Sequence, residues 1–251
     1  KSCTSGTVVA LHPRRNYIIR RASNLSKESH IIAANIDQAL LLVTLRDPET
    51  PTEFVDRFLV TCEAYKVPVT ILLSKIDLQD AGAVAEFRAV YERAGYRVLE
   101  VAAPSGEGVG EVRSLLAGRR TLVSGNSGVG KSTLIRAIDP SLDIRTGEIS
   151  ESHRKGRHTT TFSTMYPLSE GGAVIDTPGI KGFGLIDIDD AELWHYFPEM
   201  MRVASGCRFY NCTHTHEPGC AVVEAVRSGE IAFARYESYL KMLDEDDKYR
   251  K

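Results

Sequence analysis

The chain has 251 residues and a formal net charge of -2, and 43% of its residues are hydrophobic. This length predicts one or two domains with room for a buried core. The balanced charge excludes a globally basic nucleic-acid binder, so any RNA contact would come from local basic clusters such as residues 14–21 and 154–158. No apolar run approaches the ~20 residues of a membrane span, and the start lacks a signal core. We expect a cytoplasmic, monomeric protein without membrane contact.

Five apolar segments rich in β-branched residues are predicted to be strands. In chain order they are Gln38–Leu45, Val67–Leu73, Arg97–Ala102, Arg120–Ser124 and Gly172–Ile175. Helices are predicted between several of them, at Thr52–Tyr65 with Thr52 as N-cap and at Ala83–Ala94 with Gly95 after its end. Alternating strands and helices indicate an α/β fold with a parallel sheet, whose ligands bind at the carboxyl ends of the strands.

The two ends of the chain depart from this pattern. Gly6–Ala10 and Asn16–Arg20 are predicted to be short strands, too few for a stable β domain alone. After about Leu185 the chain becomes polar and helical. Its last segments are predicted to be an amphipathic helix, Glu230–Leu243, and a charged tail, Asp244–Lys251.

A phosphate-binding loop is predicted where the sequence matches G-x-x-x-x-G-K-[ST] in full, between a predicted strand and a helical segment. The residues expected to contact the nucleotide here are Gly125, Asn126, Ser127, Gly128, Val129, Gly130, Lys131, Ser132 and Thr133. Backbone N–H groups and the helix N-terminus favour bound phosphate. Lys131 would bridge the outer phosphates, and Ser132 would coordinate Mg²⁺.

Two further segments are expected to respond to the third phosphate. In Asp176-Thr177-Pro178-Gly179, Asp176 can hold the Mg²⁺ shell and the Gly179 N–H can contact the phosphate. Between this segment and the phosphate loop lies Gly156–Thr161, a polar run typical of a mobile switch loop. We assign Mg²⁺ coordination there to Thr160, with Thr159 beside the nucleotide, although spacing does not decide between the threonines. A surface loop rich in Ser and Thr is the alternative.

A guanine-reading site is predicted at Ser74-Lys75-Ile76-Asp77. The Asp77 carboxylate can accept two parallel hydrogen bonds from the N1–H and the exocyclic amine of guanine, whereas adenine presents an acceptor at N1. The stem of Lys75 can pack along the base. The usual motif is Asn-Lys-x-Asp, so Ser74 weakens or reroutes one tether of the loop. Ala102 and Ala103 begin a second loop, expected to cover the guanine.

A metal site is predicted at Cys207-x4-Cys212-x-His214-x5-Cys220. Three thiolates and one imidazole form a closed tetrahedral set, which is typical of a structural Zn²⁺ ion that stabilises a small unit. The odd, clustered cysteine count favours metal ligation over disulfides. His216 is a rival for His214, and incidental cysteines are the alternative.

The order of the motifs is itself informative. Ordinary GTPases place the phosphate loop first and the base-reading motif last, whereas here the base-reading motif precedes the phosphate loop. Because chain termini often lie close together, a fold can be re-cut without losing its core. The cut here would follow the segment that ends at Gly179, so this segment runs directly into the C-terminal unit. We expect loss of the third phosphate to shift that unit.

This order, together with Gly156–Thr161, Asp176–Gly179 and the cysteine cluster, resembles the bacterial circularly permuted ribosome small-subunit-dependent GTPases, the RsgA/YjeQ family. The resemblance implies an incomplete end of an OB-fold at residues 1–22, a circularly permuted P-loop GTPase domain at 23–188 and a helical zinc-binding domain at 189–251. It implies GTP hydrolysis to GDP with Mg²⁺, one structural Zn²⁺, binding to the small ribosomal subunit and its rRNA, stimulation by that subunit, and a role late in its maturation.

The resemblance also implies a catalytic role for His158. Many GTPases position the attacking water with a Gln after the last glycine of the switch segment, but here Ile180 holds that place, so intrinsic hydrolysis should be slow. His158 would position the water once the ribosome orders its loop, while Lys131 neutralises charge. The alternative for His158 is an exposed residue that contacts phosphate or RNA. The alternatives for the whole chain are a GTP-regulated RNA-binding scaffold with negligible turnover, and an ATPase or kinase with a coincidental base motif.

Overall fold

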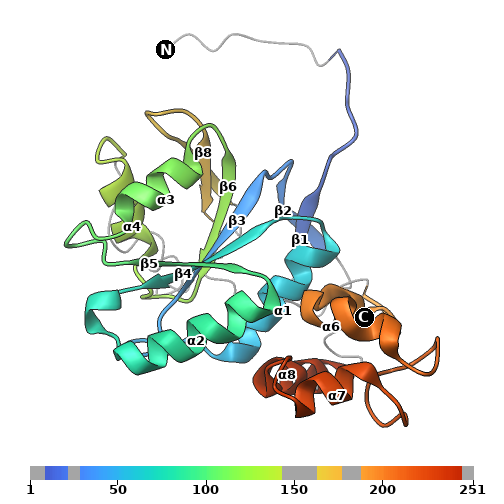
Figure 1. Ribbon diagram of the computed structural model, residues 1–251. Helices are drawn as coiled ribbons and strands as arrows, with labels where there is room; N and C mark the ends of the chain where they lie inside the picture. Colours follow the sequence, from blue (N-terminus) through green and yellow to red (C-terminus); the bar gives the residue numbers. More distant parts are fainter. Residues whose placement is uncertain (1–8, 22–28, 143–162, 177–187, 245–251) are drawn as a thin grey trace.

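The computed structural model describes residues 9–21, 29–142, 163–176 and 188–244, and the architecture below concerns these residues. A six-stranded sheet forms the centre, with helices on both faces (Figure 1). Across the sheet the strands are β5 (Arg97–Val101), β4 (Val69–Ser74), β3 (Gln38–Val43), β6 (Arg120–Gly125), β8 (Ala173–Asp176) and β7 (Thr164–Pro167). All neighbours pair in parallel except β7 with β8. The predicted parallel sheet is therefore confirmed, and β7 is an addition to it.

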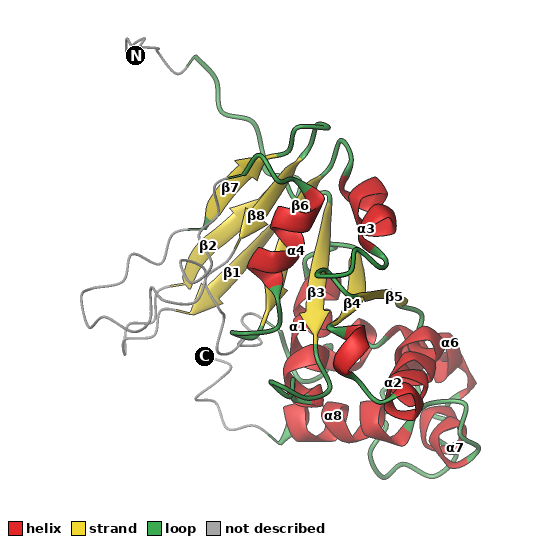
Figure 2. Cartoon of the chain, turned by 90° about the vertical axis from the view of Figure 1, so that its left-hand side faces the viewer, coloured by secondary structure: helices red, strands yellow, loops and turns green. Residues whose placement is uncertain are grey.

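The central strand β3 shows why the predicted strands are nearly continuous in apolar residues. Its six residues are all buried, because each face of the sheet is covered by helices. Leu41 packs into the core under α1 (Thr52–Ala64) and α2 (Ala81–Ala94). Leu40 packs on the opposite face, under α3 (Val109–Leu116) and α4 (Lys131–Ile138). Figure 2 shows these two helices beside the strands of the sheet.

Two local expectations for the helix ends have different outcomes. Gly95 follows α2 in the left-handed region (φ 110°), as predicted for a helix end. The predicted N-cap Thr52 is wrong by one position. Pro51 is the capping residue, because its carbonyl accepts the N–H groups of Phe54 and Val55, and it offers no side-chain cap.

The chain before the sheet forms a separate antiparallel pair, β1 (Tyr17–Arg21) and β2 (Ser29–Ala34). Asn16 ties this pair to the start of β3, since its amide donates to the Ile36 carbonyl and accepts the Ile36 N–H. The strand predicted at Asn16–Arg20 is present. The one predicted at Gly6–Ala10 is not supported where the structure describes it, because Val9 and Ala10 are irregular. The domain boundary expected after residue 22 falls between the two paired strands.

The C-terminal unit is helical, as predicted, and packs beside α1 and α2 (Figure 1). Its elements are η2 (Leu193–Tyr196), α6 (Pro198–Val203), η3 (Ala204–Gly206), α7 (Ala221–Arg227) and α8 (Phe233–Leu243). Their side chains form a third core that includes Val60 of α1. None of the helices in the described ranges is both long and apolar enough to span a membrane.

Candidate nucleotide-binding site and metal cluster

The predicted nucleotide-binding motifs meet at one edge of the sheet. Strand register places Gly125 beside Leu42, and Asp176 beside Val123. The base-reading motif begins at Ser74, at the end of β4, where it pairs with Val101 of β5. Motifs that lie far apart in the sequence therefore converge at the carboxyl ends of five parallel strands, which is where such sheets bind ligands.

The phosphate loop follows β6 and enters α4 at Lys131. Gly125 is held at φ 146°, and a Cβ there would lie only 2.6 Å from the Leu42 carbonyl oxygen, so a side chain is excluded. Gly130 caps α4, and its carbonyl accepts the N–H of Leu134. The strand, the glycine turn and the helix N-terminus thus form the arrangement that binds phosphate through backbone N–H groups.

Lys131 lies deep in this loop, with only 4% of its surface exposed. Its Nζ donates to the carbonyls of Gly125 at 2.6 Å and Asn126 at 2.8 Å. Burial lowers the pKa of Lys131 to about 8, although the carboxylate of Asp176 favours the charged form. An ammonium group held in this way beside the loop is suited to neutralise phosphate oxygens.

Asp176 is the matching acidic group, buried to 6% exposure at the end of β8. Burial raises its pKa to about 6, and Lys131 acts in the opposite direction. Its Oδ1 is buried without a hydrogen-bond partner among the described residues. An unpartnered carboxylate oxygen beside a phosphate loop fits the hard oxygen shell of Mg²⁺. Asp176 and the partly buried Ser132 would hold that ion.

The base-reading motif lies against the phosphate loop. Ser74 is buried, and a Cβ added at Gly130 would be 3.1 Å from its hydroxyl oxygen. Lys75 adopts a left-handed conformation (φ 56°), and its Nζ donates to the Asp47 carbonyl at 2.6 Å. Asp77 is exposed in the short helix η1 (Ile76–Leu78), so its carboxylate is accessible to a base.

The second predicted base loop, after β5, is a tight turn. The Ala102 N–H donates to the Glu107 carbonyl at 3.1 Å, and the Ala102 carbonyl accepts the Gly106 N–H at 3.0 Å. Ala102 is fully buried, whereas Ala103 is partly exposed. Because the Ala102 N–H is engaged within the turn, Ala103 is the better placed of the two for a backbone contact with a base.

Sequence reasoning missed the loop at residues 44–50 and the side chain that fastens it, Gln79. The loop lies between the two halves of the site, since Asp47 accepts from Lys75 and Pro48 would be 3.5 Å from a Cβ at Gly128. A polar residue in a loop has no spacing signature, so no sequence signal pointed to Gln79. The predicted His158, Thr159, Thr160 and Gly179 lie outside the described residues.

The predicted basic cluster near the start is partly engaged. The Arg15 guanidinium forms an ion pair with the Asp37 carboxylate, with 2.5 Å between nitrogen and oxygen. The same carboxylate also pairs with the Arg120 guanidinium. These contacts hold the pKa of Asp37 well below its usual range, led by the hydrogen bonds from Arg120. Arg15 therefore contributes to the junction before β3. The second basic cluster, at residues 154–158, lies outside the described residues.

The four predicted metal ligands come together in the C-terminal unit. The ligand atoms of Cys207, Cys212, His214 and Cys220 lie within 4.8 Å of one another. The His214 Nδ1 is 3.5 Å from the sulfurs of both Cys207 and Cys220. Three sulfurs and one imidazole nitrogen at these separations fit a tetrahedral Zn²⁺ ion. His216 is outside this group, and its Nδ1 contacts the Thr215 hydroxyl instead.

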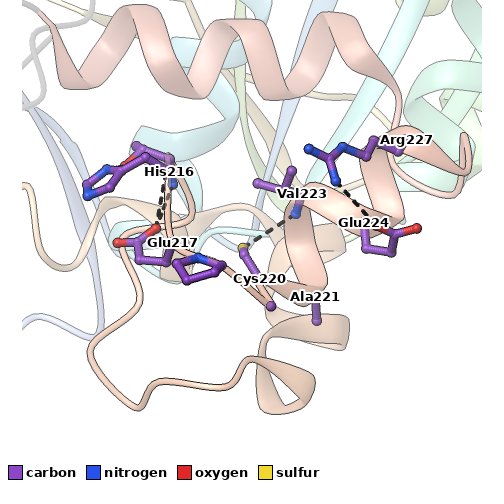
Figure 3. A pocket seen from close by; sticks show the side chains of 10 residues that line it. His216, Glu217, Cys220, Ala221, Val223, Glu224 and Arg227 are labelled. Atoms are coloured by element: carbon purple, nitrogen blue, oxygen red, sulfur yellow. Dashed lines mark hydrogen bonds and ion pairs between the residues drawn. The ribbon is translucent and has the colours of Figure 1, made fainter.

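Glu217 shapes the turn that carries His214. Figure 3 shows Glu217 beside His216 in the adjoining pocket. Its carboxylate accepts the backbone N–H groups of Thr213, Thr215 and His216. Burial acts to raise the pKa of Glu217, but hydrogen bonds from the Thr213 hydroxyl and from backbone N–H groups, including those of Thr213 and Thr215, outweigh it and hold the pKa well below its usual range. His214 itself is left-handed (φ 60°), which points its ring toward the sulfurs.

Comparisons with known proteins agree with this geometry. The family described as RsgA GTPase matches residues 11–186. The small ribosomal subunit biogenesis GTPase RsgA of Porphyromonas gingivalis is 56% identical over 246 residues, covering 96% of this chain and 78% of that relative. The protein of the same name from Bacteroides fragilis is 53% identical over 245 residues, covering 96% and 79%.

Two solved structures are also similar. The crystal structure of YjeQ from Thermotoga maritima aligns with a TM-score of 0.75 at 37% identity, covering 93% of this chain and 75% of that one. YloQ, described as a circularly permuted GTPase, aligns with a TM-score of 0.67 at 25% identity, covering 90% and 77%. The permuted order of motifs is thus shared with solved structures.

Proposed function

This chain belongs to the RsgA GTPase family, and we propose that it hydrolyses GTP to GDP and phosphate to assist late maturation of the small ribosomal subunit, which stimulates it. The observation that carries the proposal is that two buried, oppositely charged groups, Lys131 and Asp176, lie at the end of the sheet beside a complete phosphate loop, close enough for each to shift the pKa of the other. The relatives named as small-subunit biogenesis GTPases support the choice of partner.

The chemical step needs charge neutralisation and a positioned water more than covalent catalysis. Lys131 neutralises the outer phosphates. Asp176 and Ser132 would hold Mg²⁺, with Thr160 completing the ligand set when GTP is bound, and the ion would supply charge stabilisation to the transferred phosphate. Asp77 selects guanine through its exposed carboxylate, as its place in η1 supports.

Water positioning is assigned to His158. His158 acts in the complex with the subunit, so turnover is slow in the free protein and fast in the complex. The protein binds the rRNA of the small subunit, and it acts as a cytoplasmic monomer. One structural Zn²⁺ would be held by Cys207, Cys212, His214 and Cys220. The GTPase domain comprises residues 23–188, and the zinc unit comprises 189–251.

A measurement of phosphate release with purified small subunits, with large subunits and with neither tests this function. We expect small subunits, and not large subunits, to raise turnover by roughly 10²-fold or more, the usual contribution of a positioned general acid–base group. GTP binding without stimulated turnover would instead support the GTP-regulated RNA-binding scaffold. Equal competition by ATP would contradict guanine selection by Asp77.

A further inference from the structure

The side-chain amide of Gln79 joins the base-reading turn to the loop at residues 44–50. Its Oε1 accepts the N–H groups of Leu45 and Arg46, both at 3.1 Å. Its Nε2 donates to the carbonyls of Lys75 at 3.3 Å and Arg46 at 3.4 Å. One side-chain amide therefore contacts four backbone groups in two segments. Because these partners are backbone groups, the contacts do not require particular side chains at positions 45, 46 and 75.

The loop that Gln79 holds is closed on itself and touches the phosphate loop. The Thr50 N–H donates to the Thr44 carbonyl at 2.9 Å, and the Thr44 hydroxyl donates to the Pro48 carbonyl. Pro48 in turn lies against Gly128 of the phosphate loop. The loop is thus a fixed spacer between the phosphate side and the base side of the site.

The base-reading turn needs such support. Lys75 occupies the left-handed region, which disfavours a non-glycine residue, so the turn persists only if its surroundings hold it. Ser74 is short, and its hydroxyl lies against Gly130 without the reach of the usual amide. Two hydrogen bonds supply the remaining support. The Gln79 amide donates to the Lys75 carbonyl, and the Lys75 ammonium group donates to the Asp47 carbonyl.

We propose that Gln79 is a positioning residue for guanine recognition. Its side-chain amide supplies the support of the base-reading turn that is weakened because Ser74 replaces the usual Asn. The amide holds the turn in which Lys75 and Asp77 lie, and it fixes this turn against the spacer loop. Gln79 thereby sets the place of the Asp77 carboxylate relative to bound phosphates. The inference rests on the proposed function, because it requires that guanine nucleotides bind at this site.

The experiment compares GDP with inosine diphosphate, which lacks only the exocyclic amine that Asp77 would recognise. Dissociation constants for both are measured by fluorescence competition on the full chain. For Gln79→Ala we expect GDP binding to weaken about tenfold, as a loss of several hydrogen bonds implies, and the preference for GDP over inosine diphosphate to fall severalfold. Gln79→Glu keeps the oxygen that accepts the N–H groups of Leu45 and Arg46. It should therefore lose less GDP affinity, and less preference for GDP over inosine diphosphate, than Gln79→Ala.

Asp80→Ala is the matched control, because Asp80 neighbours Gln79 and caps α2 by accepting the Ala83 N–H at 2.9 Å. It weakens the same segment without touching the amide contacts, so the preference for GDP should be kept. An unchanged preference in Gln79→Ala, or an equal loss in Asp80→Ala, overturns the assignment. A wild-type chain that binds neither diphosphate would instead contradict the proposed function itself.

Discussion

The guanidinium of Arg235, in the last helix, donates a 2.6 Å hydrogen bond to the carboxylate of Asp56, in the first. Its Nε also donates to Glu199 of α6 at 2.7 Å. All three side chains are at most 2% exposed, and the Tyr91 hydroxyl donates to the same Asp56 oxygen at 3.0 Å. The C-terminal unit is thus joined to the sheet-bearing part of the chain by a buried, hydrogen-bonded ion cluster.

Arg235→Met should strongly destabilise the fold, because it leaves Asp56 and Glu199 buried without a cation. Removing one partner of a buried pair costs about 3–5 kcal/mol. The free energy of unfolding, from urea titration, measures this loss. A triple variant with Asp56→Asn, Glu199→Gln and Arg235→Met should recover most of it, since no charge is then left unpaired.

Lys241→Met is the matched control for this prediction. Lys241 also joins α8 to α1, through Glu53 at 3.0 Å, but both side chains are about half exposed. Exposed pairs contribute little because water already solvates their charges. We expect no resolvable change in unfolding free energy. A similar loss for Lys241→Met and Arg235→Met would show that burial is not the cause.

His214→Ala and His216→Ala should separate the two candidate zinc ligands. His214 lies with the three sulfurs, whereas His216 does not. Elemental analysis should find one zinc per chain in the wild type and in His216→Ala, and much less in His214→Ala. The melting temperature should fall only for His214→Ala, because the metal stabilises this small unit. Zinc retained by His214→Ala would contradict the assigned ligand set.

The zinc site also shows where sequence reasoning reaches its limit. Spacing identified the three cysteines but left His214 and His216 open, because both lie at plausible separations. The choice depends on the left-handed turn at His214 and on Glu217, which holds the neighbouring N–H groups. Such backbone geometry has no direct signature in residue spacing, so it could be found only in three dimensions.

The parallel strands of the sheet were more predictable than the antiparallel edge strand β7. The inner strands are buried on both faces, so continuous apolar runs marked them clearly. The edge strand β7, at Thr164–Pro167, has three exposed residues, one of them a proline, and gives no such signal. β2 was not predicted, because its strand conformation depends on pairing with β1 and not on the pattern of apolar residues in its own sequence. Gln79 was missed because all its partners are backbone groups.

Asp139 should contribute to the loss of stability in acid. Hydrogen bonds from the Ser141 side chain and the Ser169 backbone lower the pKa of Asp139 to about 2, below its ordinary value of 3.8. A lowered folded-state pKa means that the stabilisation is present above about pH 4 and is lost as the pH falls toward about 2. These bonds fasten the end of α4 to the turn between β7 and β8.

Asp139→Asn removes the titrating group while keeping the side-chain shape. The wild type should therefore exceed the variant in urea midpoint at about pH 5, and this difference should shrink by about pH 2. Other carboxyls titrate in both proteins and cancel in the comparison. A difference that stays constant with pH would show that Asp139 does not titrate as described.

His158→Ala tests the assigned water-positioning role. Nucleotide affinity should stay close to that of the wild type, because the phosphate loop and Lys131 provide the binding contacts. Turnover stimulated by the small subunit should fall by roughly 10²-fold or more, the usual contribution of a general acid–base group. Phosphate release at saturating GTP and saturating subunits measures this, and a separate binding assay checks that the variant still joins the subunit.

Lys131→Ala is the contrasting variant, because it should lose nucleotide binding itself. Its ammonium group is the buried cation of the phosphate loop, and among the described residues no other cationic side chain donates a hydrogen bond to the Gly125 carbonyl. The two variants thus separate binding from chemistry: a loss of kcat alone for His158→Ala, and a loss of affinity for Lys131→Ala. If His158→Ala keeps full stimulated turnover while binding the subunit, another group positions the water.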